Sequence, residues 1–141
     1  MKTIISILIS ALMLISCGTP SSPTAPSGDK AETEAETVNT YRQVTSERAM
    51  EMMQTEKDYI ILDVRTAEEY SEGHIPNAIN VPNESIGTEE IPSLPDKNQL
   101  IMVYCRSGRR SKEASQKLVG LGYTNIVEFG GIIDWNGETV K

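Results

Sequence analysis

Residues 100–110 read Leu-Ile-Met-Val-Tyr-Cys-Arg-Ser-Gly-Arg-Arg. The apolar run from Leu100 to Tyr104 is typical of a strand that is buried on both faces of a sheet. A helical pattern follows from Ser111 to Leu121. We therefore expect a buried strand that delivers Cys105 to a tight loop, and a loop that opens into the N-terminus of a helix.

The position of Cys105 favours a reactive thiolate. Backbone N–H groups and the positive end of a helix stabilise negative charge at such a place. Three arginines follow within five residues (Arg106, Arg109 and Arg110), although the chain carries a formal net charge of -7. Like charges on one short loop repel each other unless an anion compensates them, which counts against the alternative of an inert cysteine beside a solvated loop. The pattern predicts a cysteine nucleophile for a small anionic substrate.

On either side of this unit, short apolar runs alternate with helical patterns. The predicted strands are residues 41–44, 59–64, 78–81, 100–104 and 125–129. The predicted helices are residues 46–53, a short helix from 66, a weak helix at 85–90, 111–121 and a closing helix at 132–135. This alternation predicts an α/β fold with a mainly parallel central sheet and helices on both faces. Ligands bind beyond the carboxyl ends of strands in such sheets, where Cys105 would lie.

The first 16 residues are similar to the signal peptide of a bacterial lipoprotein. Lys2 precedes an apolar stretch, Ile4 to Ile15, that is too short to span a bilayer comfortably. The ending Leu14-Ile15-Ser16-Cys17 resembles a lipobox. The resemblance implies cleavage before Cys17, lipidation of its sulfur and anchoring to a bacterial membrane outside the cytoplasm, on the periplasmic side or the cell surface. An ordinary cleaved signal peptide with a chance cysteine is the alternative.

The rest of the chain divides into a linker and one domain. Residues 17–40 are rich in Ser, Thr, Pro, Ala and Glu, which predicts a flexible linker after the lipidated N-terminus. Residues 41–141 suffice for one core. With Cys17 lipidated, Cys105 has no partner for an intramolecular disulfide. The acidic composition argues against nucleic-acid binding, and we expect a monomer.

Four stretches that span nearly all of residues 41–141 resemble single-domain rhodaneses, the thiosulfate sulfurtransferases. They are Leu62-Asp63-Val64-Arg65 with Glu68-Glu69-Tyr70; Gly73-His74-Ile75-Pro76-Asn77-Ala78-Ile79-Asn80; the loop from Cys105 to Arg110; and Gly130-Gly131-Ile132 with Trp135. The second stretch is the most specific of the four. The resemblance implies a rhodanese-like α/β domain.

The resemblance also implies what the loop does. Cys105 takes a sulfane sulfur from thiosulfate or a related persulfide donor and passes it from a persulfide to a thiol or cyanide. Neither a metal ion nor a cofactor is required, because the attacking and leaving groups both act as anions near neutral pH. The residues that the resemblance assigns to substrate binding are Arg106, Ser107, Gly108, Arg109, Arg110 and Ser111.

Three polar residues outside the loop are expected to support the site. Asp63 and Arg65 lie at a strand end, and we interpret them as a structural ion pair. His74 is the single histidine, and its Gly-His-Ile-Pro setting favours a hydrogen-bonded structural role over catalysis.

Two other functions stay open at this point. Cysteine phosphatases separate the cysteine and an arginine by five residues, but Ser111 occupies that position here and Arg110 falls one residue short. No general acid for a phosphatase is identifiable either. A persulfide carrier that delivers sulfur to one protein partner, without turnover on small thiols, is the remaining alternative.

Overall fold

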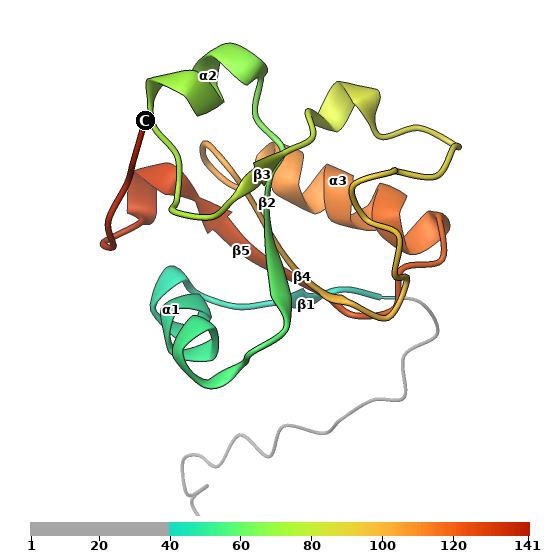
Figure 1. The fold of residues 1–141 in the computed structure, drawn as a ribbon, viewed down its shortest axis with the longest axis horizontal. Helices are drawn as coiled ribbons and strands as arrows, with labels where there is room; N and C mark the ends of the chain where they lie inside the picture. The colour runs from blue at the N-terminus through green and yellow to red at the C-terminus, as the bar shows by residue number, and fades with distance from the viewer. Residues whose placement is uncertain (1–39) are drawn as a thin grey trace, which may run out of the picture. The chain divides into compact units, whose positions relative to one another are not determined.

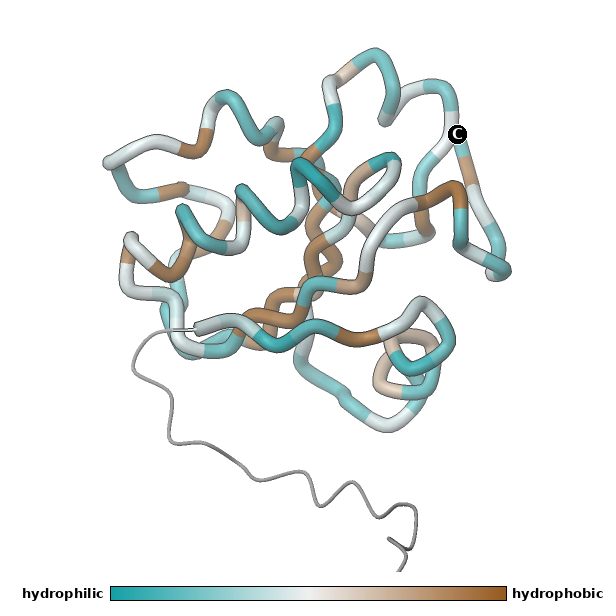
Figure 2. Tube along the Cα trace, turned by 180° about the vertical axis from the view of Figure 1, so that it is seen from behind, coloured by the Kyte–Doolittle hydropathy of each residue, from teal (hydrophilic) through white to brown (hydrophobic). Residues whose placement is uncertain are grey.

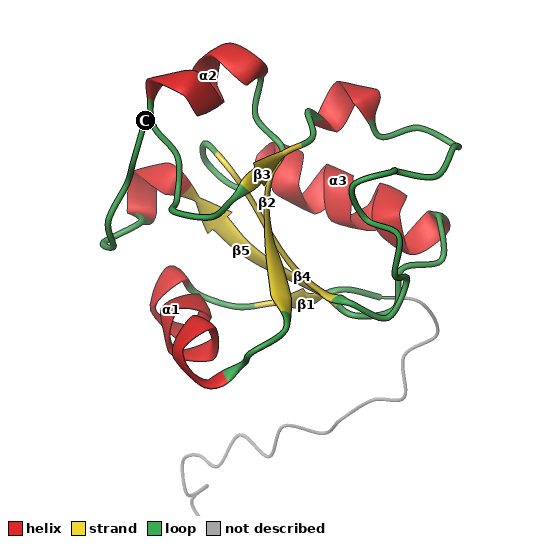
Figure 3. Cartoon of the chain, viewed as in Figure 1, coloured by secondary structure: helices red, strands yellow, loops and turns green. Residues whose placement is uncertain are grey.

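The computed structural model describes residues 40–141. The predicted signal peptide (1–16), the lipidation at Cys17 and, apart from Thr40, the linker (17–40) lie outside the described residues. No helix within the described range is long and apolar enough to cross a membrane. The elements, drawn in Figures 1 and 3, are β1 (Arg42–Gln43), α1 (Ser46–Thr55), β2 (Tyr59–Asp63), α2 (Ala67–Glu72), β3 (Ile79–Asn80), the 3₁₀ turn η1 (Asn83–Ser85), β4 (Leu100–Cys105), α3 (Arg109–Gly120), β5 (Ile126–Gly131) and the 3₁₀ turn η2 (Ile132–Asp134).

The five strands form one parallel sheet in the order β1-β5-β4-β2-β3. The central strand β4 is buried along its whole length, as its uninterrupted apolar run requires. Because the strands are parallel, their carboxyl ends meet at one edge of the sheet. Cys105 is the last residue of β4 and therefore lies at the middle of that edge.

Each face of the sheet carries its own hydrophobic cluster. Ile101, Val103 and Cys105 pack with α3 and the segment 86–94 on one face. Met102 and Tyr104 pack with α1, the segment 75–78 and η2 on the other. The alternation follows from the period of two along a strand. In Figure 2 the brown, apolar stretches of the trace gather along the central strands. These contacts confirm the predicted α/β fold with helices on both faces.

One predicted helix is absent, and another is a single 3₁₀ turn. Residues 85–90 do not form a helix. The 3₁₀ turn η1 ends at Ser85, and Ile86 is buried beside Gly87, a residue that disfavours helix. The predicted closing helix at 132–135 is one 3₁₀ turn, Ile132–Asp134, which ends where the Trp135 backbone becomes extended. The start of α3 also differs: it begins at Arg109 rather than Ser111, since Gly108 supplies the N-cap.

Ser115 on α3 has an unusual environment. Its side chain is fully buried, and within residues 40–141 its hydroxyl has no hydrogen-bond partner. A buried hydroxyl without a partner costs about 1–3 kcal/mol, and alanine also has the higher helix propensity. We expect Ser115→Ala to raise the free energy of unfolding by about 1 kcal/mol, measured by urea denaturation. A lower urea midpoint would show instead that this hydroxyl makes a stabilising contact.

Candidate active site

The loop after β4 lies tightly against the end of β5. The register between the two strands shifts between Val103 and Cys105, so that Cys105 pairs with Gly131. A Cβ atom on Gly131 would lie 2.2 Å from the Arg106 carbonyl oxygen and 2.6 Å from the Ser107 Cα. Because both neighbours are backbone atoms, only glycine permits this approach. The end of β5 therefore fixes where the loop lies.

The Cys105 sulfur meets the N-terminus of α3. Cys105 is 1% exposed, and its Sγ accepts a hydrogen bond from the Gly108 amide over 3.1 Å. Among the amides of residues 106–111, this is the one that reaches the sulfur. Gly108 adopts a φ of 98°, which glycine tolerates best. The amide and the positive helix end together favour negative charge on the sulfur.

The three loop arginines do not all surround the sulfur. Arg110 forms a two-pronged ion pair with Glu69 of α2, at 2.7 and 2.8 Å. The Arg109 side chain is 82% exposed and lies 3.9 Å from Glu113. Arg106 is exposed as well and lines a cavity beside the loop. The structure thus leaves Arg106, without an ion-pair partner in residues 40–141, as the loop arginine directed to a cavity.

The Glu69–Arg110 pair makes stability depend on pH. Hydrogen bonds from Arg110 hold the pKa of Glu69 at about 2, below its ordinary value of 4.5. The pair therefore stabilises the fold fully above the unfolded pKa, and this contribution is lost as the pH falls from about 4.5 to about 2. We expect Glu69→Gln to lower the free energy of unfolding by about 1 kcal/mol at neutral pH. Near pH 2, the lower end of this range, the free energies of unfolding of the variant and the wild type should be equal.

Urea denaturation at a series of pH values checks this expectation. Glutamine can still cap α2 at this position, so the variant removes the charge and keeps the hydrogen bond to the Thr66 amide. Glu68→Gln, in the same turn, is the matched control, because no ion pair involves Glu68 within the described residues. A difference between Glu69→Gln and wild type that persisted at about pH 2 would contradict the assignment.

Asp63 and Arg65 form a buried ion pair where β2 ends. The Arg65 side chain donates to both Asp63 carboxylate oxygens, with 2.6 Å between Nη2 and Oδ2. The Tyr104 hydroxyl donates to the same carboxylate (2.6 Å). Burial and the Asp63 charge raise the pKa of Tyr104 above its ordinary value, so the phenol remains a donor. Arg65 also donates to the Gly73 carbonyl (2.7 Å) and so links β2 to the segment after α2.

His74 is held by contacts with Tyr70 and Val140. Its Nδ1 lies 3.0 Å from the Tyr70 carbonyl oxygen, and its ring stacks on the Tyr70 ring at 3.8 Å between centroids. Its backbone exchanges two hydrogen bonds of 2.8 Å with Val140. These contacts connect the segment after α2 with the end of the domain.

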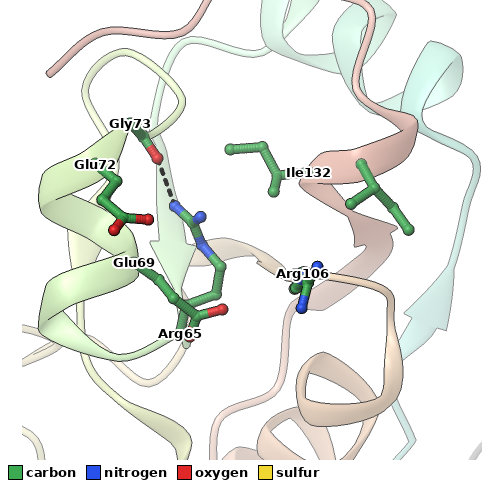
Figure 4. Close-up of a pocket in the computed structure, with 7 residues that line it drawn as sticks. Arg65, Glu69, Glu72, Gly73, Arg106 and Ile132 are labelled. Atoms are coloured by element: carbon green, nitrogen blue, oxygen red, sulfur yellow. Dashed lines mark hydrogen bonds between the residues drawn. The ribbon is translucent and has the colours of Figure 1, made fainter.

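A cavity of about 440 Å³ opens between α2 and η2, next to the Cys105 loop. One wall carries Arg65 and the carboxylates of α2, and Arg106 and Ile132 lie across from them (Figure 4). Ile133, which also lines it, is 62% exposed, the one large apolar side chain so exposed in residues 40–141. The cavity thus combines two guanidinium groups, acidic groups and apolar surface. Its lining residues are Arg65, Glu69, Glu72, Gly73, Arg106, Ile132 and Ile133.

The site consists of a buried cysteine at the end of the central strand of a five-stranded parallel sheet. The family model described as the rhodanese-like domain matches residues 45–138. The chain belongs to the rhodanese-like family.

Named relatives of this rhodanese-like chain include sulfurtransferases. The thiosulfate sulfurtransferase PspE of Escherichia coli is 38% identical over 80 residues, which cover 57% of this chain and 77% of that protein. A sulfurtransferase of Allochromatium vinosum is 34% identical over 96 residues, covering 66% and 86%. Among solved structures, a rhodanese with anions from E. coli matches with a TM-score of 0.54 and 38% identity, over 59% of this chain and 98% of that one. These relatives support a sulfurtransferase or sulfur-carrier role.

This rhodanese-like domain has no arginine at the position that cysteine phosphatases use to bind phosphate. Ser111, which stands where a phosphatase has arginine, is completely buried on the first turns of α3. The nearest arginine in sequence, Arg110, is engaged by Glu69. A tetrahedral phosphate would therefore lack the arginine that surrounds it in that class.

Sequence reasoning missed one buried residue of the rhodanese-like site, Glu128 of β5. It is 2% exposed, and its Oε1 accepts hydrogen bonds from the Ser111 hydroxyl (2.5 Å) and the Gly130 amide (2.9 Å). Its signal in the sequence is an acidic residue inside an otherwise apolar strand, Ile126 to Phe129. Charged residues are almost never fully buried without a partner. An acidic residue in an apolar strand therefore indicates a buried hydrogen-bond partner, which the periodicity of the strand does not.

Proposed function

We propose that this chain moves a sulfane sulfur from thiosulfate, or a related persulfide donor, to a thiophilic acceptor through a persulfide on Cys105. The observation that supports it best is the sulfur of Cys105 against the Gly108 amide at the N-terminus of α3. That contact stabilises an anion on sulfur both before and after the transfer. The sulfurtransferase relatives agree with this chemistry.

The first half-reaction is a displacement at sulfur. The Cys105 thiolate attacks the outer sulfur of thiosulfate, a sulfur–sulfur bond to the cysteine forms, and the bond between the two thiosulfate sulfurs breaks. Sulfite leaves with the bonding electron pair, and the persulfide keeps one negative charge. Arg106 is the candidate for the sulfonate end, because its guanidinium lines the cavity beside the loop.

The second half-reaction returns the site to its starting state. A thiolate or cyanide attacks the terminal sulfur of the persulfide, and the Cys105 thiolate is the leaving group. The Gly108 amide that stabilised the persulfide then stabilises this thiolate. No metal ion is required in either half, because every attacking and leaving group is an anion.

Intact-mass measurement of the protein after brief exposure to thiosulfate tests the proposal. We expect a gain of one sulfur, which cyanide removes as thiocyanate. An unchanged mass after exposure to thiosulfate would refute thiosulfate as the sulfur donor. Hydrolysis of an aryl phosphate by the same sample would favour the phosphatase function. A persulfide that resists small thiols and cyanide until a protein acceptor is added would favour the sulfur carrier.

We also propose that residues 1–16 direct export and that Cys17 carries the lipid anchor. The proposal rests on the residue pattern before and at Cys17. Two or more acyl chains would hold the protein stably at a membrane face outside the cytoplasm. Expression of the full chain in a bacterium, followed by membrane fractionation, tests it: Cys17→Ser should release the protein from the membrane fraction, and an unchanged distribution would refute the anchor.

A further inference from the structure

Three side chains connect the Cys105 sulfur to a buried carboxylate. Cys105 Sγ lies 3.6 Å from Ser111 Oγ, and Ser111 Oγ lies 2.5 Å from Glu128 Oε1. All three residues are buried. They come from three elements: Cys105 ends β4, Ser111 lies on α3, and Glu128 lies on β5. Glu128 pairs in register with Val103, two residues before Cys105, so both side chains face α3.

The number of hydrogens decides the direction of these contacts. A hydroxyl has one hydrogen to donate, and an ionised carboxylate accepts only. Ser111 Oγ lies near three acceptors: Glu128 Oε1 at 2.5 Å, the Gly108 carbonyl oxygen at 3.0 Å and the Gly130 carbonyl oxygen at 3.3 Å. The contact with Glu128 is the shortest of the three, so we assign the serine hydrogen to it, and Ser111 Oγ then faces Cys105 as an acceptor. Only the thiol S–H can fill that contact. The chain then runs from the sulfur to the serine oxygen and from the serine hydrogen to Glu128.

We propose that Glu128 is a positioning residue that takes up the Cys105 proton through Ser111. The thiol proton moves to Ser111 Oγ as the serine proton moves to Glu128 Oε1, so that one S–H and one O–H bond break and two O–H bonds form. The products are a thiolate and a neutral carboxylic acid. Ser111 then donates to the sulfur and accepts from Glu128, with the hydrogen-bond directions reversed.

The exchange leaves the charge of the site unchanged. Thiol with carboxylate and thiolate with carboxylic acid both carry one negative charge, so no proton has to reach solvent from a buried site. The persulfide of the proposed reaction also carries one negative charge, and Glu128 stays protonated throughout the transfer. The inference rests on the proposed role of Cys105 and adds the group that holds its proton.

Other charged groups around Cys105 do not offer the same route. The Arg110 guanidinium, on the first turn of α3, is occupied by its two hydrogen bonds to Glu69. Among the described residues, no carboxylate besides Glu128 reaches Ser111. The charged groups around the site are Arg106 from the loop, Arg110 from α3, Glu69 from α2, the Asp63–Arg65 pair at the end of β2, and Glu128 from β5.

The test measures the thiol itself, without a sulfur donor. The full chain is treated with methyl methanethiosulfonate, a small neutral reagent that methylthiolates thiolates, and the rate is followed by intact mass across a pH series. Cys17→Ser in every sample leaves Cys105 as the only thiol. Because thiosulfate takes no part, a failure of this inference is distinguishable from a failure of the proposed sulfur transfer.

Glu128→Gln is the decisive variant. Glutamine still accepts from Ser111 and Gly130 through its carbonyl oxygen but cannot take up a proton. We expect the rate at about pH 6 to fall by about a hundredfold, and the pH profile of the reaction to move to higher pH. Ser111→Ala removes the middle group of the hydrogen-bond chain and should shift the pH profile in the same direction. It tests the proposal independently if Glu128→Gln does not fold.

Two results would overturn the proposal. An unchanged profile in Glu128→Gln would mean that the residue only holds the backbone of Gly130. A faster reaction would mean that the carboxylate merely repels the thiolate, since the amide removes that repulsion. Ser115→Ala, one turn further along the buried face of α3 and without a hydrogen-bond partner in residues 40–141, is the matched control and should leave the profile unchanged.

Discussion

Replacing Cys105 with serine should lower the rate of thiocyanate formation from thiosulfate and cyanide by a factor of about 10⁴ or more. A serine hydroxyl is not ionised near neutral pH, and a single Gly108 amide at 3.1 Å cannot stabilise an alkoxide enough to change that. The oxygen also cannot form a persulfide. The gain of one sulfur in the intact mass should therefore vanish together with turnover.

The chain supplies its own control for this variant. Cys17→Ser removes the other cysteine, which lies outside the predicted domain, and should leave the turnover of thiosulfate unchanged. Serine is close to cysteine in size, so the urea midpoint of Cys105→Ser reports whether the buried position still packs. Sulfur transfer that survived in a folded Cys105→Ser protein would refute Cys105 as the nucleophile.

Arg65→Ala should be the most destabilising of the substitutions considered, by about 3–5 kcal/mol. The guanidinium is 7% exposed and the Asp63 carboxylate fully buried, so its removal leaves a buried carboxylate with only the Tyr104 hydroxyl and the Arg65 backbone amide as donors. The loss of the bond to the Gly73 carbonyl also frees the segment after α2. Domains of this size have total stabilities of about 5–15 kcal/mol, so the variant is expected near the limit of folding.

An exposed arginine provides the comparison. Arg48 pairs with Glu51 at 2.8 Å, but both side chains are more than 60% exposed. Exposed pairs of this kind contribute less than about 1 kcal/mol, and Arg48→Ala should change the urea midpoint only slightly. Similar midpoints for Arg65→Ala and Arg48→Ala would show that burial adds nothing to the Asp63–Arg65 pair.

The order of strands and helices was predictable because the central strands β2, β4 and β5 contain local apolar runs. Leu100 to Tyr104 is buried throughout, and Tyr59 to Val64 passes from half-buried to buried. Both runs predict strands without any tertiary information. The segment 85–90 was not predictable in the same way. Its helical pattern competes with the need to bury Ile86 and Ile91 under α3, and this need is a property of the folded molecule.

The part of the candidate site that could be predicted consists of residues close together in the sequence. Cys105 and its loop are contiguous in sequence, and so are Asp63 and Arg65, whose ion pair could be anticipated. The Arg110–Glu69 pair joins residues 41 positions apart, and the three loop arginines are equivalent in the sequence. The partners of Glu128 also come from distant segments: Ser111, which donates to it, lies 17 positions earlier on α3.

The bridge between His74 and Val140 has a practical consequence for handling this protein. It holds the last residues of the domain beside α2 (Figure 1), next to Gly73, whose carbonyl receives Arg65 at the wall of the cavity. An affinity tag or fluorescent fusion placed after Lys141 would therefore sit at the mouth of the site. The chain enters the sheet through β1 at the edge opposite the carboxyl ends of the strands, so a label attached before Thr40 leaves that mouth open.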